Sequence, residues 1–127
     1  MMKKLLITTA IFEAITGILL MAAPLYVTSM LLGEESLGAV ALTIARIAGA
    51  ALIALAIACL FSQQSDHAIN VVKAMLFYNI AATSVLIYSK LALDLKGIGL
   101  VPAIGIHLIL AVWSIVAIQT RSIQSKT

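Results

Sequence analysis

The sequence predicts an all-α protein: a single domain, residues 1–127, in which four transmembrane helices form an up-down-up-down bundle. Hydrophobic residues make up 63% of the chain and its mean hydropathy is +1.16, whereas soluble domains are roughly 45–50% apolar. Four apolar segments approach the roughly 20 residues that a helix needs to cross a ~30 Å hydrocarbon core. The bilayer is therefore the expected solvent of this chain.

The first predicted span runs from Leu5 to Ala23 and ends at Pro24, which cannot continue a helix. The same stretch resembles a secretory signal, with basic residues, an apolar run and small residues before Pro24. Glu13 lies in the middle of that run, which is also longer than the apolar core of such signals. We therefore expect the segment to be a retained transmembrane helix.

The segment that starts at Pro24 predicts a short interfacial helix between the first two spans. Proline suits the first turn of a helix, where its missing N–H would have no partner. Tyr26 falls at headgroup depth, and the next apolar residues face the acyl chains: Met30, Leu31 and Leu32. This helix is expected to end before Gly33.

The second predicted span, Leu37 to Phe61, is rich in small residues. Small side chains let the backbones of two helices approach closely in lipid. We therefore predict a helix-packing stripe on this span, made of Ala45, Gly49, Ala50, Ala54 and Ala58.

The third and fourth predicted spans run from Val71 to Leu93 and from Leu100 to Gln119. The polar segment SQQSDHAIN precedes the third span, and DLKGIG separates it from the fourth. Pro102 falls in the first turn of the fourth span, where proline is tolerated. These connections are short, so successive helices are expected to be neighbours.

Basic residues near the ends of the spans predict the orientation, because cytoplasmic loops carry an excess of lysine and arginine. With a cytoplasmic N-terminus, Lys90 and Lys96 lie outside. The basic residues on the inside are then Lys3, Lys4, Lys73, Arg121 and Lys126. We predict that both termini are cytoplasmic and that the first outer connection, with Glu34 and Glu35, is outside.

Polar residues interrupt all four spans at similar depth, about 10–16 Å from the outer ends at ~1.5 Å per residue. A charge at mid-membrane costs at least ~2.5–3.5 kcal/mol, so ionisable residues there face the bundle interior and pair. We expect Arg46 to pair with Glu13. The predicted buried polar layer consists of Glu13, Arg46, Asn79, Thr83 and His107.

Two interpretations of this layer stay open at the level of sequence. A buried ion pair can simply fix the register of two helices. Ionisable residues inside a membrane are also the usual mark of a site for a proton, an ion or a head group.

Several classes of chemistry are not indicated. Cys59 is the single cysteine, and no metal-ligand spacing, nucleophile motif or phosphate-binding loop is present. His67 and His107 are predicted near opposite faces of the membrane, which disfavours haem ligation by both. The basic residues are scattered, without the stripe that nucleic-acid binding needs. We expect no metal, haem or nucleic acid, and no catalytic chemistry of the chain's own.

The chain resembles the DoxX-like group of small four-helix bacterial membrane proteins. The resemblance is carried by Glu13 and Gly17, by Pro24, by Leu32-Gly33, and by Arg46 with Gly49. It implies a four-helix bundle with polar residues in the first two helices. For some relatives it also implies respiratory or sulfur redox chemistry through quinones.

The segment AIFEAITG is similar to the first helix of the small multidrug transporters. That resemblance puts Glu13 in the position of their proton- and substrate-binding carboxylate. The chain departs from them in its third span, which lacks their tyrosine and tryptophan motif, since Trp113 lies in the fourth.

From the four apolar spans and the buried polar layer, we expect a small accessory or interaction subunit of the bacterial inner (cytoplasmic) membrane. A chain with no soluble domain offers a partner little besides its helices, so we expect a homo-oligomer or a place in a larger membrane complex. A proton-coupled transporter and a quinone-binding redox subunit are the alternatives.

Overall fold

The computed structural model describes residues 1–65 and 67–124, and this part of the chain contains five helices and no strand. All but one of the helices are long and apolar enough to cross a membrane. The all-α fold class is therefore confirmed, and the apolar helices match a multi-pass membrane protein. The orientation stays a prediction, and Lys126 lies outside the described residues. The helices are α1 (Met2–Ala22), α2 (Pro24–Leu32), α3 (Ala39–Ser62), α4 (Ala68–Leu91) and α5 (Leu100–Gln124).

The short helix α2, which lies between the candidate spans, has the predicted boundaries. Pro24 is its first residue, because a proline ring ends α1 yet fits a first turn. Gly33 closes α2 in the left-handed conformation, at φ 83°, and donates its N–H to Ser29 O at 2.8 Å. The sequence prediction of a helix that ends before Gly33 is confirmed.

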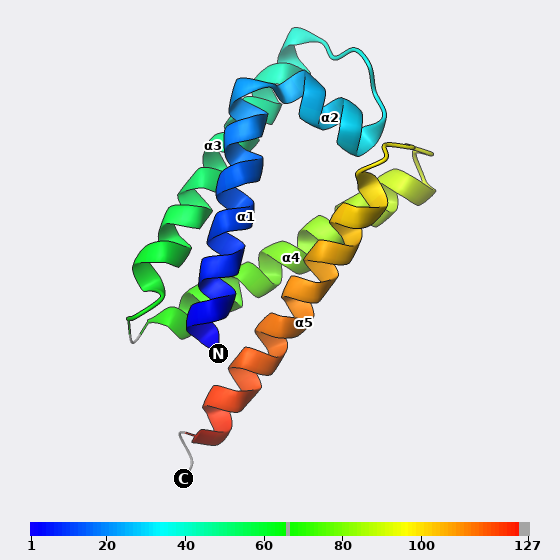
Figure 1. Ribbon diagram of the computed structural model, residues 1–127. Coiled ribbons are helices and arrows are strands. Elements are labelled where there is room, and N and C mark those ends of the chain that lie inside the picture. The colour runs from blue at the N-terminus through cyan, green and yellow to red at the C-terminus, as the bar shows by residue number, and fades with distance from the viewer. Residues whose placement is uncertain (66, 125–127) are drawn as a thin grey trace.

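The long helices form two pairs, α1 with α3 and α4 with α5, which cross one another (Figure 1). The backbones of α1 and α3 meet closely at two glycines. A Cβ on Gly17 would lie 2.7 Å from Gly49 O, and a Cβ on Gly49 would lie 2.7 Å from Gly17 O. Only glycine permits this approach, so these two residues set the distance between α1 and α3.

Only part of the predicted packing stripe on α3 is buried within the chain. Gly49 is buried and Ala45 is half-buried, whereas the other three members of the stripe are exposed: Ala50, Ala54 and Ala58. The buried side of α3 instead follows steps of three and four residues through Gly49, Leu52, Ala56 and Cys59. Ala50 follows Gly49 directly and so lies about 100° further around the helix, and Ala54 and Ala58 continue along that exposed side.

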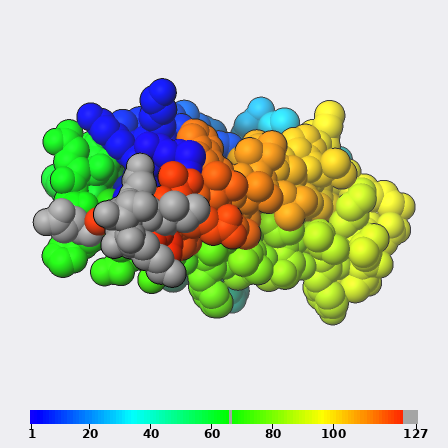
Figure 2. Space-filling view, turned by 90° about the horizontal axis from the view of Figure 1, so that it is seen from below, coloured from blue at the N-terminus to red at the C-terminus, as the bar shows by residue number. Residues whose placement is uncertain are grey.

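The apolar core lies at the end of the molecule where α1 begins and α5 ends. The side chains that fill it come from the first turns of α1 and α4, from the last turns of α3, and from the middle and later turns of α5. Figure 2 looks at this end and shows the start of α1 beside α5. Its fully buried members include Leu6, Cys59 and Val72. The two helix pairs are thus joined at one end and diverge toward the other.

Helix α2 bridges the diverging end through backbone contacts. Gly99 donates its N–H to Met30 O at 2.8 Å, which ties the α4–α5 connection to the last turn of α2. A Cβ on Gly97 would collide with the carbonyl group of Leu31. The connection therefore depends on a glycine at this position, and α2 closes the space between the helix pairs from above (Figure 1).

Candidate functional site

The structure corrects the predicted ion pair. Arg46 is exposed, and its Nε donates to the backbone oxygen of Met21 at 3.3 Å. Glu13 is 1% exposed and lies in the interior. No ion pair joins Glu13 to Arg46. The depth of each residue along its helix could be predicted from the sequence, but the direction of its side chain could not, and Arg46 points outward.

Glu13 has an aromatic partner in place of the arginine. The hydroxyl of Tyr78, on α4, donates to Glu13 Oε2 at 3.5 Å, a long and weak hydrogen bond. The other carboxyl oxygen, Oε1, is buried with no hydrogen-bond partner in the described part of the chain. Tyr78 therefore links α1 to α4, and Glu13 keeps an unused hydrogen-bonding position.

His107 and Asn79 form the best-defined polar contact of the interior. Asn79 Nδ2 donates to Met75 O at 2.7 Å, so the amide oxygen is the atom that faces His107. His107 Nδ1 lies 2.8 Å from that oxygen and must carry the hydrogen. In a neutral imidazole the second nitrogen, Nε2, is then an acceptor. No residue among those described bonds to it.

Aromatic contacts join these two polar pairs. The ring of Tyr78 meets that of His107 edge to face, with centroids 5.7 Å apart, and Phe12 approaches the same histidine at 6.3 Å. Both arrangements are favourable geometries for aromatic rings. Thr83, one turn beyond Asn79, is buried, and its Oγ1 has no partner in the described residues. The interior thus holds a connected cluster of polar and aromatic side chains.

This cluster adjoins a cavity of about 610 Å³ between the two helix pairs. All five helices line it, and its lining is almost entirely apolar. Thr16, Tyr78 and His107 supply polar groups inside the bundle. On another side, α2 contributes Tyr26, Val27, Met30 and Leu31. A largely apolar cavity with a few polar groups is typical of a small-molecule site.

Of the five predicted site residues, the structure places Glu13, Asn79, Thr83 and His107 in the interior and Arg46 outside it. His107 alone among them lines the cavity, and Glu13 lies behind Tyr78. Tyr78 was not among the site residues predicted from the sequence. Its position next to Asn79 on one predicted helix is the signal that could have placed it near the polar layer.

The described residues contain no group of three histidine, cysteine, aspartate or glutamate side chains that could hold a metal ion. Among them, His107 and Tyr78 line the cavity, and Glu13 contacts Tyr78 from behind. The arrangement can accept and donate hydrogen bonds to a bound molecule.

A comparison with protein-family models, with curated proteins and with solved structures finds no match to this chain.

Proposed function

We propose that this protein binds a small lipophilic molecule inside the membrane, in the cavity between its two helix pairs. The observation that carries the proposal is the cavity of about 610 Å³, apolar except where Tyr78, His107, Thr16 and Tyr26 line it. An apolar ligand that enters the cavity from the bilayer would contact these walls instead of lipid chains. Tyr78 and His107 would orient one end of it.

The polar end favours a ligand that donates a hydrogen bond. Asn79 holds the Nδ1 hydrogen of His107, so the unpaired Nε2 is an acceptor. The hydroxyl hydrogen of Tyr78 points to Glu13, which leaves its oxygen lone pairs for a ligand. A hydroxyl or N–H group on the ligand could donate to either atom. A carbonyl group on the ligand could accept from neither of these two atoms.

The two alternative functions expected from the sequence would each use a ligand with such a donor group. A hydroquinone carries the required hydroxyl groups, which keeps the quinone-binding subunit as one form of the proposal. A lipophilic amine carries N–H groups, which keeps the transporter as another. For transport, Glu13 is suited to binding a proton because no cation is paired with it in the described residues.

Thermal unfolding of the purified protein in detergent tests the donor preference. A ligand that binds only the folded state raises the midpoint temperature. We expect 1-naphthol to raise it more than 1-methoxynaphthalene, which has the same rings without the hydroxyl donor. His107→Phe should remove the difference, while Ser84→Ala, at an exposed position of α4, should keep it. Equal shifts with both compounds in the wild type would contradict the donor preference.

A second candidate function, the interaction subunit, is supported by the outer side of α3. Ala50, Ala54 and Ala58 are exposed and four residues apart, a spacing that allows another helix to approach closely. If two copies of this chain pair there in the inner membrane, Ala54→Cys in a Cys59→Ala background should form an intermolecular disulfide. Ile109→Cys, exposed on α5, is the matched control. Equal crosslinking at the two positions would argue against pairing through α3.

A further inference from the structure

Tyr78 is the described residue that both lines the cavity between the helix pairs and bonds to the side chain of Glu13. Its hydroxyl group has one hydrogen, which can turn about the C–O bond, and lone pairs that accept hydrogen bonds. The distance of 3.5 Å to Glu13 Oε2 marks a weak hydrogen bond, so a change of partner costs the hydroxyl little. A change at Glu13 can therefore reach the cavity through the orientation of this one hydrogen.

The protonation state of Glu13 decides where the hydroxyl hydrogen of Tyr78 points. An ionised carboxylate only accepts hydrogen bonds, so it holds this hydrogen, and the cavity meets an acceptor at Tyr78. A protonated carboxyl group has an O–H of its own, which on Oε2 donates to the oxygen of Tyr78 and leaves the hydroxyl hydrogen for the cavity. On Oε1, which is buried without a partner in the described residues, the carboxyl hydrogen would stay unpaired.

We infer that the cavity binds a ligand with a carbonyl group together with one proton, the proton on Glu13 and the carbonyl oxygen at the hydroxyl of Tyr78. This second class of ligand rests on the proposed function, because it occupies the same cavity. The proton comes from the surrounding water and forms one new O–H bond, on Glu13, while no other covalent bond changes. The carbonyl ligand and the proton each raise the affinity for the other, because binding effects between two sites are reciprocal.

No lysine or arginine forms an ion pair with Glu13 in the described part of the chain. Helix α4 contributes Tyr78, and α3 contributes the thiol of Cys59, which interacts electrostatically with the carboxylate. Helix α5 contributes His107, whose ring meets that of Tyr78. Tyr26, the ionisable side chain of α2, is exposed. Phenols and thiols are neutral near pH 7, so these neighbours do not fix the charge of Glu13.

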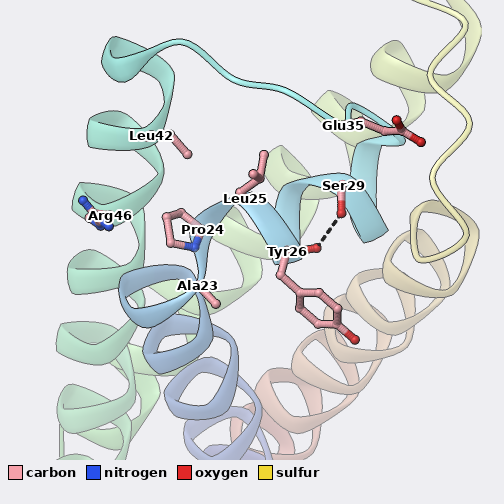
Figure 3. Close-up of a pocket in the computed structure, with 8 residues that line it drawn as sticks. All are labelled: Ala23, Pro24, Leu25, Tyr26, Ser29, Glu35, Leu42 and Arg46. Atoms are coloured by element: carbon pink, nitrogen blue, oxygen red, sulfur yellow. Dashed lines mark hydrogen bonds between the residues drawn. The ribbon is translucent and has the colours of Figure 1, made fainter.

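Arg46, the cation of α3, lies on the outer surface of the helix pair. It is exposed, and its Nε donates to Met21 O at 3.3 Å. Figure 3 shows Arg46 on α3, beside a separate hollow of about 580 Å³ where α2 begins at Pro24. Its positive charge is therefore directed away from the interior and does not hold Glu13 in the ionised form.

Isothermal titration calorimetry of the purified protein in detergent tests the inference with two matched ligands. 1-Acetylnaphthalene carries a carbonyl group, and 1-ethylnaphthalene has the same rings and a similar shape without it. We expect the affinity ratio of the first to the second to rise about threefold to tenfold between about pH 9 and about pH 5.5, the factor for one neutral hydrogen bond. Buried carboxyl groups change protonation state in this range. Two buffers with different heats of ionisation should show net proton uptake with 1-acetylnaphthalene only.

Four variants separate the role of Glu13 and Tyr78 from other sources of pH dependence. Glu13→Met removes the acceptor and frees the hydroxyl hydrogen, so the ratio should be high at both pH values, a gain that misfolding cannot produce. Tyr78→Phe should give a low ratio at both. His107→Phe removes the imidazole beside Tyr78 and should keep the pH dependence. Ser84→Ala, at an exposed position of α4, is the matched control and should behave as the wild type.

Three results would overturn the inference. One is a wild-type ratio that is the same at both pH values. Another is a pH-dependent ratio that persists in Tyr78→Phe or Glu13→Met. The third is loss of the pH dependence in His107→Phe, which would assign it to the histidine. If the wild type still prefers 1-naphthol to 1-methoxynaphthalene, these results leave the proposed function in place, whereas a wild type that binds none of the four naphthalenes contradicts both.

Discussion

His107 Nδ1 lies 2.8 Å from Asn79 Oδ1, and this hydrogen bond connects α5 to α4 beside the cavity between the helix pairs. Asn79 is held in turn by its own bond to Met75 O. The result is a fixed tautomer of His107, with the nitrogen that remains free acting as an acceptor. The proposed preference for a donor ligand depends on this relationship.

Asn79→Leu should destabilise the protein, because it leaves the buried Nδ1–H of His107 without a partner. The expected loss is about 1–3 kcal/mol in the free energy of unfolding. Unfolding in a detergent series measures it, and the double variant with His107→Leu should be less damaged than the sum of the single variants. Additive losses would show that the two side chains do not stabilise each other.

Gly17→Ala and Gly49→Ala should each weaken the α1–α3 pair, since a Cβ at either position would lie 2.7 Å from the opposite carbonyl oxygen. Added atoms in a packed interface typically cost about 1–3 kcal/mol. Gly105→Ala on α5 is the control, because nothing lies within 4 Å of its added Cβ. If all three variants unfold alike, the close glycine contact does not contribute to stability.

Glu13→Ala and Arg46→Ala should have additive effects on unfolding, because the two side chains share no contact. Distant sites usually add to within about 0.3–0.5 kcal/mol. A double-mutant cycle on the free energy of unfolding measures the coupling directly. A coupling above about 1 kcal/mol would instead support the ion pair expected from the sequence.

Gly97→Ala should detach α2 from the α4–α5 connection, because the new methyl group meets the carbonyl of Leu31. Hydrogen exchange at the Gly99 amide, which bonds to Met30 O at 2.8 Å, should then become faster. Gly38→Ala provides a control in open space. Unchanged exchange in Gly97→Ala would mean that α2 does not depend on this backbone contact.

The predicted orientation can be tested with single cysteines in a Cys59→Ala background. Ser36 and Gln64 are both exposed and lie in connections at opposite ends of α3. With both termini cytoplasmic, an impermeant thiol reagent applied to intact cells should label Ser36→Cys and leave Gln64→Cys unlabelled. The reverse labelling pattern would show the opposite orientation, with both termini outside.

The helices could be predicted from the sequence because their signals are local. Apolar length identifies a span, and Pro24 and Gly33 mark the two ends of α2 through their own backbone preferences. The burial of Glu13 and His107 also follows from one rule, the cost of exposing polar groups to lipid. None of these predictions requires knowledge of which helices are neighbours.

The partners within the site could not be predicted, because they depend on the rotation and crossing of whole helices. Depth along a helix placed Arg46 level with Glu13, but α3 turns Arg46 outward. The same rotation exposes Ala50 and Ala54 and buries Leu52. Tyr78 reaches Glu13 only because α4 crosses α1, a relation between residues 65 positions apart.

Identifying the molecule that occupies the cavity between the helix pairs tests the proposed function most directly. Native mass spectrometry of the wild type, extracted gently from its own membrane, should show one bound small molecule that is not a phospholipid. Ala103→Phe, which fills the cavity from α5, should lose that mass, and Ala54→Phe on the outer side of α3 should retain it. A wild type without any such mass, or equal retention in Ala103→Phe, would contradict the proposed function.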